Sequence, residues 1–333
     1  MEGIAIIRAA ARSLRAGERV VECVVVGSEG SVARPAGARM LLLQDGSFVG
    51  TIGGGAPEHL AQRRARVVMA GEGDACIERF DHKSTGSVCG GSQLVGTRLL
   101  GARDLDTFAM VLDAVDARER GRLKVLWDNG KTVARFERVG PHDASFCAGL
   151  ATYEGDASRG VYTECICAAE RAFVFGGGHV GRELVPLLAN VGFDVTVFDD
   201  REPFARPENY PRARRVICGS YEDVSAHVSL GWDDYVCVMT HGHAADELVV
   251  AQALAARTRY LGCMGSRKKR AVLERVLRDK GFTETDLAAV ELPVGLDIGA
   301  VTPPEIAVSI AARMVQVRSS ERGAGLASCP GTA

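Results

Sequence analysis

The spacing of apolar and polar positions divides the chain into a strand-rich first region and a second region in which strands and helices alternate. In the first region, apolar residues recur at helical spacing within residues 1–20 and over 57–70 and 105–118, which predicts helices there. Apolar and β-branched runs predict strands, some of them joined as hairpins. The strands are expected at 20–27, at 38–52 with a turn at 44–46, at 74–81, at 93–100, and at 124–136 with a turn at 128–130. Residues 1–140 are therefore predicted to form a mixed α+β domain.

The second region follows a regular order of strand and helix. Its strands are expected at 171–175, 194–198, 214–218, 234–239 and 259–264, and its helices at 179–191, 244–257, 268–280 and from Thr302 onward. This alternation predicts a Rossmann-like, doubly wound parallel sheet over 166–318. Apolar periodicity fades over 141–165, which predicts a linker, and the Ser- and Gly-rich composition of 319–333 predicts a disordered tail.

Composition narrows the class of protein. Hydrophobic residues make up 47% of the 333 residues and charged residues 25%, which is typical of a globular protein. A formal net charge of −2 offers no positive field for nucleic acid, and no apolar run is long enough to span a membrane. The start of the chain lacks a signal-peptide pattern, and the ten cysteines are scattered. We therefore expect a cytoplasmic protein with reduced thiols that binds neither nucleic acid nor membranes.

The strongest local motif is the glycine-rich stretch at 176–181, which follows an expected strand and opens an expected helix. Gly176 permits the tight turn, Gly178 allows a phosphate to approach the backbone, and Gly181 allows the helix to pack closely on the strand. Exposed amides at the positive end of the helix would hold the anion. Asp199, at the end of the next strand, stands where a ribose or another diol would need an acceptor. The alternative is a doubly wound fold whose glycines serve packing alone.

Further polar segments follow other expected strands. They are Thr240, His241, His243 and Asp246 after one strand, and Ser266 and Arg267 after the next. Because ligands of open α/β sheets bind at the carboxyl ends of the strands, these residues are candidate walls of the same site. The two histidines and the aspartate provide only three metal ligands, so no permanent metal site is predicted. The alternatives are histidines that cap a helix and a basic run that forms a solvated helix face.

The first domain repeats the pattern of strand, glycine turn and helix at Gly53, Gly54 and Gly55. Upstream, the loop over 30–39 carries Arg34 and Arg39, whose guanidinium groups could bind a phosphate. Cys89, in a Cys-Gly-Gly motif, could offer an accessible thiol, although a buried and inert thiol is the alternative.

Taken together, these segments resemble the xanthine dehydrogenase accessory factor family of the XdhC/CoxI type over nearly the whole chain. The resembling stretches are 30–40, 45–55 and 89–91 in the first domain, and 174–181, 239–249, 260–270 and 293–312 in the second. Several motifs in one order are more specific than a single glycine fingerprint.

The resemblance implies a helper protein that performs no catalysis of its own. Such a factor binds molybdenum cofactor (molybdopterin), protects it while a sulfido ligand replaces an oxo ligand, and delivers it to a xanthine dehydrogenase-type molybdenum hydroxylase. A cysteine desulfurase is then expected as sulfur donor, and a homodimer stays open. The expected cofactor-binding residues are Gly176, Gly177, Gly178, His179, Gly181, Asp199, Thr240, His241, His243, Ser266, Arg267, Arg34, Arg39, Gly53, Gly54, Gly55 and Cys89.

One motif departs from the family. Where many members carry Gly-Gly-Gly-Cys-Leu-Glu, this chain has Ala56 and Pro57 after Gly55, so no thiol is available there to contact the metal. The main alternative function is an NAD(P)-dependent oxidoreductase that uses the second domain, with His241 or His243 for proton transfer. A metal or redox sensor built on the cysteines is a third.

Overall fold

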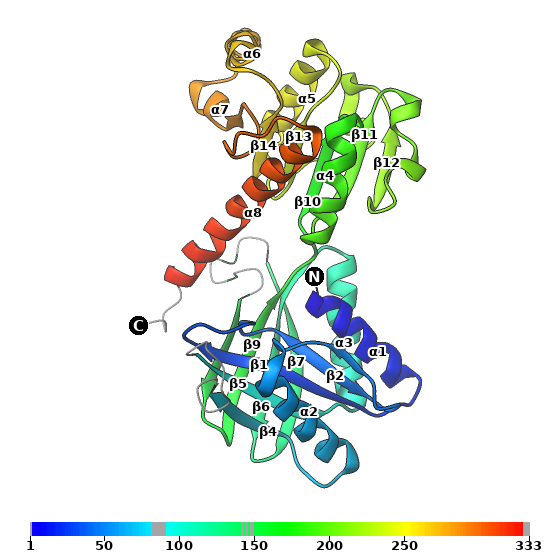
Figure 1. The fold of residues 1–333 in the computed structure, drawn as a ribbon, viewed down its shortest axis with the longest axis vertical. Coiled ribbons are helices and arrows are strands. Elements are labelled where there is room, and N and C mark those ends of the chain that lie inside the picture. Colours follow the sequence, from blue (N-terminus) through cyan, green and yellow to red (C-terminus); the bar gives the residue numbers. More distant parts are fainter. Residues whose placement is uncertain (1, 82–90, 141–142, 144–145, 147–149, 329–333) are drawn as a thin grey trace. The chain divides into compact units, whose positions relative to one another are not determined.

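The computed structural model describes residues 2–81, 91–140, 143, 146 and 150–328. The chain divides into two compact units, one formed by Met1–Ala168 with Arg322–Ala333 and the other by Ala169–Glu321. We call them the N-terminal unit and the C-terminal unit (Figure 1).

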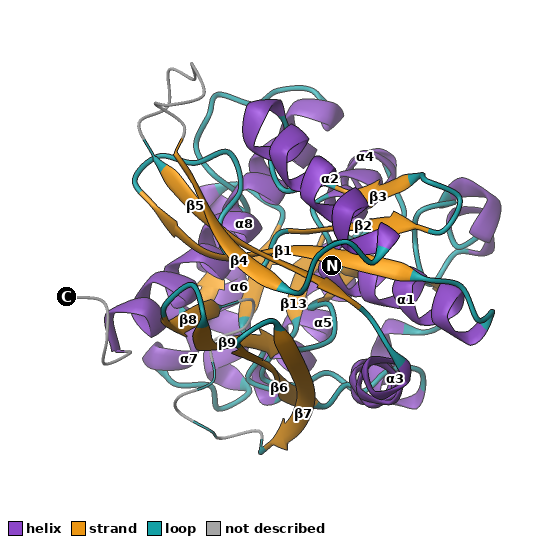
Figure 2. Ribbon diagram, turned by 90° about the horizontal axis from the view of Figure 1, so that it is seen from below, coloured by secondary structure: helices purple, strands orange, loops and turns teal. Residues whose placement is uncertain are grey.

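The N-terminal unit combines helices with antiparallel strands (Figure 2). Its helices are α1 (Glu2–Arg15), α2 (Gly55–Ala70) and α3 (Ala102–Asp116), and its strands are β1 (Val20–Glu29), β2 (Arg39–Leu43), β3 (Phe48–Gly50), β4 (Cys76–Asp81), β5 (Ser92–Leu99), β6 (Arg120–Asp128), β7 (Lys131–Val139), β8 (Ala151–Gly155) and β9 (Arg159–Ile166). The predicted helices and hairpins of this domain are confirmed.

Strand β1 is central to a five-stranded sheet with the order β3-β2-β1-β5-β4, in which all pairings are antiparallel. Its residues are buried on both faces, which explains why the run Val20–Val26 is apolar with almost no alternation. Val20 packs in the cluster with residues of α1 and α3, whereas Val21 and Cys23 pack in the cluster with residues of α2. Helices therefore cover both sides of this sheet.

The predicted linker over 141–165 is corrected by the structure. Strands β8 and β9 lie in this range and complete a four-stranded antiparallel sheet with the order β7-β6-β9-β8. Tyr162 and Cys165 of β9 are buried, so the segment belongs to the core of the N-terminal unit. The turn residues around these short strands hide their alternation in the sequence. The unit boundary lies at Ala168 and Ala169 instead.

The C-terminal unit alternates strands with helices. Its strands are β10 (Arg171–Phe175), β11 (Asp194–Asp199), β12 (Arg215–Cys218), β13 (Tyr235–Val238), β14 (Tyr260–Cys263) and β15 (Val290–Glu291). Its helices are α4 (His179–Asn190), α5 (His243–Ala255), α6 (Arg267–Asp279), α7 (Glu284–Ala288) and α8 (Pro303–Ser328), with short 3₁₀ turns at Glu202–Phe204, Pro207–Asn209 and Tyr221–Ala226.

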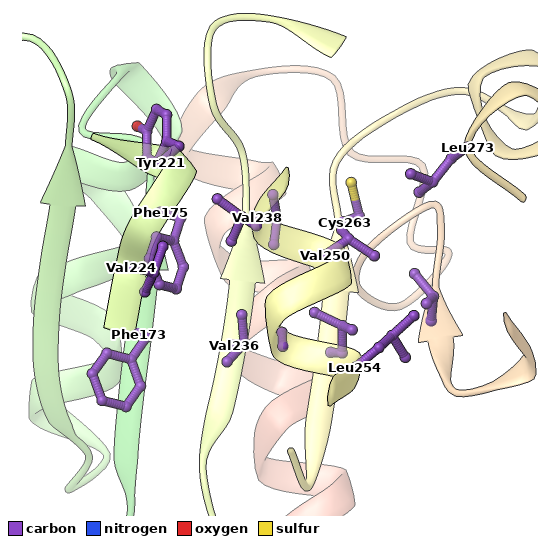
Figure 3. Packing of buried hydrophobic residues seen from close by; sticks show 14 of the residues in the cluster. Phe173, Phe175, Tyr221, Val224, Val236, Val238, Val250, Leu254, Cys263 and Leu273 are labelled. Atoms are coloured by element: carbon purple, nitrogen blue, oxygen red, sulfur yellow. The ribbon is translucent and has the colours of Figure 1, made fainter. Parts of the chain in front are cut away.

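The six strands form one parallel sheet with the order β12-β11-β10-β13-β14-β15. The order reverses between β10 and β13, which is the switch point of a Rossmann-like fold. Helices α5 and α6 pack in one core cluster with Phe175 and Val238 (Figure 3), whereas α4 and α8 pack in another with Val174 and Cys237. The predicted doubly wound sheet is confirmed.

The end of the chain differs from its prediction. Helix α8 continues to Ser328, beyond the expected end at Arg318, and residues 329–333 lie outside the described part of the chain. Good helix formers such as Glu321, Arg322 and Leu326 alternate there with the glycines and serines that suggested disorder. Within the described ranges, no helix combines the length and the apolar character needed to cross a membrane.

Candidate functional site

The turn from β10 to α4 requires three of its glycines for steric reasons. A Cβ added at Gly177 would stand 2.3 Å from the carbonyl oxygen of Phe204, and Gly176 and Gly181 are similarly constrained. Gly176 has a φ of +114°, and a Cβ added there would stand 2.2 Å from the carbonyl oxygen of Met239. A Cβ at Gly181 would stand 2.4 Å from the carbonyl oxygen of Gly176, so this glycine brings the helix close to the turn. The tight turn and the close helix packing predicted for Gly176 and Gly181 are therefore confirmed.

Gly177 and Gly178 have different environments. The amide of Gly177 donates to Asp199 Oδ2 over 2.7 Å, and its carbonyl oxygen accepts from the hydroxyl of Tyr210, so both backbone groups are already engaged. Gly178 is the N-cap of α4, has no side-chain cap, and a Cβ added there would meet no atom within 4 Å. There is therefore open space beside Gly178 at the N-terminus of α4, and the next residue, His179, is exposed.

A second helix begins beside this turn. Helix α5 has Gly242 as its N-cap, again without a side-chain cap, and it follows β13, the neighbour of β10 in the sheet. The two helices pack in different core clusters, so their positive ends flank the switch point from the two faces of the sheet. Helix α6 differs, because Ser266 caps its Lys269 amide. Two uncapped helix N-termini at one switch point are typical of an anion site.

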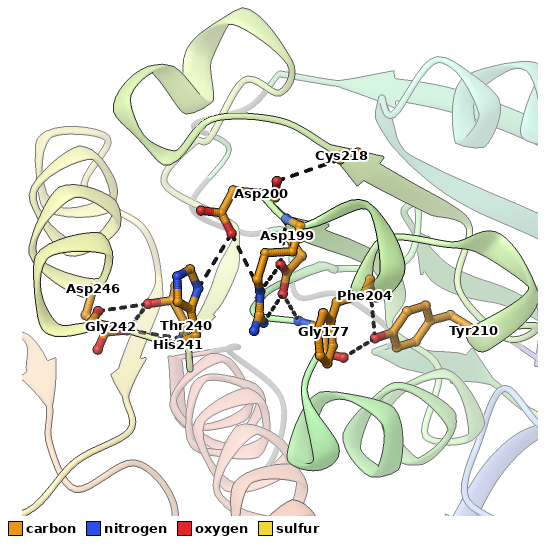
Figure 4. A network of polar contacts seen from close by, with 11 residues as sticks. Gly177, Asp199, Asp200, Phe204, Tyr210, Cys218, Thr240, His241, Gly242 and Asp246 are labelled. Atoms are coloured by element: carbon orange, nitrogen blue, oxygen red, sulfur yellow. Dashed lines mark hydrogen bonds and ion pairs between the residues drawn. The ribbon is translucent and has the colours of Figure 1, made fainter.

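Asp199 lies at the carboxyl end of β11, where the sequence predicts it, but its oxygens are already occupied (Figure 4). Arg201 donates to Oδ1 from its amide and Nε, both over 2.9 Å, and to Oδ2 from Nη2 over 3.0 Å. Although burial raises it, the pKa of Asp199 is lowered by these bonds and by the Gly177 amide. Asp199 is therefore a buried carboxylate neutralised by Arg201, a residue that the sequence analysis did not single out.

The two candidate histidines have different surroundings. His241 is exposed, with Nδ1 3.6 Å from Oδ1 of Asp200, and His243 is the exposed first residue of α5. Asp246 is buried instead. Over the described ranges, no three metal-ligating side chains gather, so these residues do not come together as one ligand set.

Asp246 links the two loops that follow β13 and β14. It is 2% exposed and accepts from the amide of Thr240 over 3.1 Å and from its hydroxyl over 2.8 Å. Lys269 of α6 forms an ion pair with the same carboxylate and also donates to the carbonyl oxygen of Met264 over 2.6 Å. Thr240 and Ser266 thus serve local structure, and Arg267 is the first residue of α6.

In the N-terminal unit, the turn before α2 is filled by a side chain of the protein itself. Glu58 Oε2 accepts from the amides of Ile52 over 2.9 Å and Gly54 over 3.0 Å, and from the hydroxyl of Thr51. Gly53, Gly54 and Gly55 have positive φ values of 130°, 76° and 68°. The glycines therefore allow a backbone turn that wraps around an internal carboxylate, and the Gly54 amide, one of those expected to bind a phosphate, is in use.

We expect Glu58→Ala to lower the free energy of unfolding of the N-terminal unit by roughly 2 kcal/mol, because it leaves two amides and a hydroxyl without their acceptor. Although burial raises it, the pKa of Glu58 is lowered by the Thr51 hydroxyl and the turn amides. The stabilisation should therefore be present at neutral pH and be lost as the pH falls through that lowered pKa. Urea unfolding at several pH values measures it, with the exposed Glu72→Ala as control. Equal, small effects of both variants would contradict the assignment.

The other candidates of this unit are Arg34, Cys89 and Arg39. Arg34 is half-buried and pairs with Glu2, and its carbonyl oxygen accepts from Gln93 Nε2, which also donates to Ile52. Gln93 thus joins the arginine loop to the glycine turn, a contact that the sequence analysis missed. Cys89 lies outside the described residues.

The structure corrects the prediction that Arg39 binds a phosphate. It is 1% exposed and forms ion pairs with Glu22 and Glu164 inside the N-terminal unit. A guanidinium group held in this way is not available to an outside phosphate, so Arg39 has a structural role. Arg39 is the first residue of β2, which pairs with β1 on one side and β3 on the other, and this position explains its burial.

The fold and the site define a protein with a Rossmann-type unit, in which two uncapped helix N-termini meet at the switch point, joined to an antiparallel unit. Comparison with known proteins agrees: residues 173–314 match the XdhC Rossmann domain, and residues 13–81 match the XdhC and CoxI family. The chain therefore belongs to the XdhC and CoxI family, which includes relatives concerned with the molybdenum cofactor.

Similar proteins include three curated relatives. The uncharacterized protein YqeB of Escherichia coli (strain K12) is 32% identical over 156 residues, which are 46% of this chain and 28% of that protein. A probable xanthine dehydrogenase subunit of Bacillus subtilis (strain 168) is 25% identical over 90% of this chain and 94% of its own length. The molybdenum cofactor insertion chaperone PaoD of Escherichia coli (strain K12) is 23% identical over 94% and 88%.

A solved structure has the same fold. The crystal structure of a xanthine dehydrogenase from Bacillus halodurans superposes with a TM-score of 0.79, covers 96% of each chain and is 24% identical. At this identity, the likeness concerns the fold.

Proposed function

We propose that the protein binds molybdenum cofactor, protects it during sulfuration and delivers it to a xanthine dehydrogenase-type molybdenum hydroxylase. The observation that carries the proposal is the uncapped turn at Gly178, where a glycine faces open space although its φ of −73° would suit other residues. The protein itself does not need a glycine there, so the open space suits an outside group. Membership of the XdhC and CoxI family and the likeness to the chaperone PaoD support the cofactor class.

The phosphate of the cofactor would be held at the start of α4, by the amides that follow Gly178, with the start of α5 beside it. The cofactor when bound supplies a phosphate ester and a metal carried by a pterin dithiolene, and the chain supplies the helix ends that favour the negative charge. His241 lies on the loop before α5 and His243 is the first residue of that helix, and both residues are exposed. Their imidazoles would donate hydrogen bonds to the rest of the ligand.

Cys23 of β1 and Cys263 of β14 are buried, whereas Cys218 at the end of β12 is exposed. Burial raises the pKa of Cys23 and that of Cys263 to about 12, so both remain protonated at neutral pH. Because the thiolate is the reactive form, these residues are unsuited to carry sulfur. As the family resemblance implies, we assign the supply of sulfur to a cysteine desulfurase, and binding and transfer of the cofactor to this chain.

We expect Gly178→Val to reduce the amount of cofactor that the protein retains by at least about tenfold, which corresponds to about 1.4 kcal/mol. The added side chain would fill the space beside the helix start without meeting protein atoms. The measurement is fluorescence of the oxidised pterin after purification from a host that makes the cofactor.

Gly101→Val is the matched control, since Gly101 is also a helix N-cap with open space around it, but it belongs to the N-terminal unit. The control should keep its pterin. Normal retention by Gly178→Val, with both variants folded, would move the phosphate site elsewhere. Absence of pterin from the unaltered protein in such a host would refute the cofactor class. Delivery is tested by mixing the loaded protein with cofactor-free hydroxylase and following the hydroxylase activity.

A further inference from the structure

The carboxyl end of β11 holds an acid that has no free acceptor position. Asp199 is 0% exposed, and each of its oxygens accepts two hydrogen bonds, three from Arg201 and one from the Gly177 amide. Three of the four donors come from Arg201, two residues along the chain, and the fourth comes from the turn before α4. These bonds hold the Asp199 side chain in one position beside the turn from β10 to α4.

Arg201 is itself held from two directions. Its Nε and Nη2 bond the two oxygens of Asp199, and its guanidinium group lies over the ring of Phe204 at 3.9 Å from the ring centre. The side chain is 32% exposed, so it covers the carboxylate on the side that solvent and ligands can reach. Because it is both ion-paired and stacked on an aromatic ring, the guanidinium group is well ordered where it covers the carboxylate of Asp199.

This pairing conflicts with ordinary dinucleotide binding. In sheets of this strand order, the acid at the end of the second strand accepts a hydrogen bond from a ribose hydroxyl. Here, a ribose could approach Asp199 only after Arg201 leaves it. The exchange would replace bidentate, charged hydrogen bonds by weaker bonds to neutral hydroxyl groups.

The neighbouring acid does not offer the same function. Oδ1 of Asp200 lies 3.6 Å from His241 Nδ1 and 3.8 Å from Arg201 Nε, so it is turned toward the loop after β13 (Figure 4). Both acids at the end of β11 therefore face cationic or imidazole groups of the chain itself.

We propose that Arg201 is a specificity-determining residue that closes the end of β11 to the ribose of NAD. The site then accepts a ligand anchored through its phosphate at the α4 turn, with no ribose diol on Asp199. The inference rests on the proposed function only in taking that turn as the anion site. It separates this unit from the dehydrogenases that share its strand order.

The test is a fluorescence titration of the full chain with NADH and with NADPH. The unaltered protein should bind neither. Arg201→Met, which keeps an unbranched apolar stem but removes the guanidinium group, should bind NADH at least about tenfold more tightly than the unaltered protein. Arg201→Lys, which keeps the charge, should show a smaller gain and covers the case in which Arg201→Met does not fold.

The control is Arg206→Met, an exposed arginine on the following turn whose Nε donates to Glu202 over 2.8 Å. It should bind no NADH. Removing the acid in Arg201→Met/Asp199→Ala should abolish the gain, because the ribose then has no acceptor. The proposal is overturned by tight NADH binding to the unaltered protein, by NADPH binding that Arg201→Met abolishes, or by no gain in folded Arg201 variants. Pterin retention by the unaltered protein is measured separately, so loss of the proposed function would not be mistaken for any of these results.

Discussion

Arg98→Met should lower the free energy of unfolding of the N-terminal unit by about 3–5 kcal/mol, the cost expected when one partner of a buried ion pair is removed. Arg98 is 1% exposed, and it donates from Nε to Glu22 over 2.8 Å and from Nη1 to Asp104 over 2.6 Å. The variant leaves both carboxylates in the interior with less positive charge to balance them. Trp127, buried in the same unit, reports the transition in urea when the other tryptophan is replaced by Trp232→Phe.

The exposed Arg103→Met, on helix α3, is the control and should change stability little. The pH dependence gives a second check. Burial raises the pKa of Glu22, but Arg98 and Arg39 outweigh burial and hold it below its usual value. The unaltered unit should therefore lose this contribution as the pH falls through that lowered pKa, whereas Arg98→Met should show less of that loss. An Arg98→Met protein as stable as the control would show that the pair contributes nothing.

The same buried network shows where sequence reasoning fails. Arg39 follows a glycine loop, and such a position suggests a surface cation. Its partners, Glu22 and Glu164, come from strands far apart in the chain, and no periodicity reveals which charges a fold will bury together. The same holds for Glu58, because its position near a glycine turn in the sequence does not show that its carboxylate fills that turn.

The glycine turn of the C-terminal unit could be predicted because its determinants are local. Gly181 is required by its contact with Gly176 in the same turn, and the strand before the turn is an apolar run. The contact of Gly176 with Met239 joins segments far apart in the chain, but the glycine spacing alone marks the turn. Asp199 was placed correctly because its determinants are also local. Its occupation by Arg201 depends on side-chain direction after the strand ends, which the sequence pattern does not specify.

Lys269→Met should lower the free energy of unfolding of the C-terminal unit by roughly 3 kcal/mol. This value is in the lower part of the range for a broken buried ion pair, because the side chain of Lys269 is 15% exposed. The change leaves Asp246, 2% exposed, with only the two donors of Thr240.

The consequence should be local as well as global, because Asp246 and Lys269 hold the turn before α5 and the turn before α6. Hydrogen exchange of peptides covering 239–246 and 264–270 in increasing urea measures both effects. Lys268→Met is the matched control, since Lys268 is the exposed neighbour on the same helix. Asp246→Asn keeps an acceptor for Thr240 and removes the charge, so the double variant with Lys269→Met should be more stable than the sum of the single effects predicts. If Lys269→Met and Lys268→Met exchange alike, the ion pair does not hold these turns, and the loops beside the proposed anion site must be ordered by other contacts.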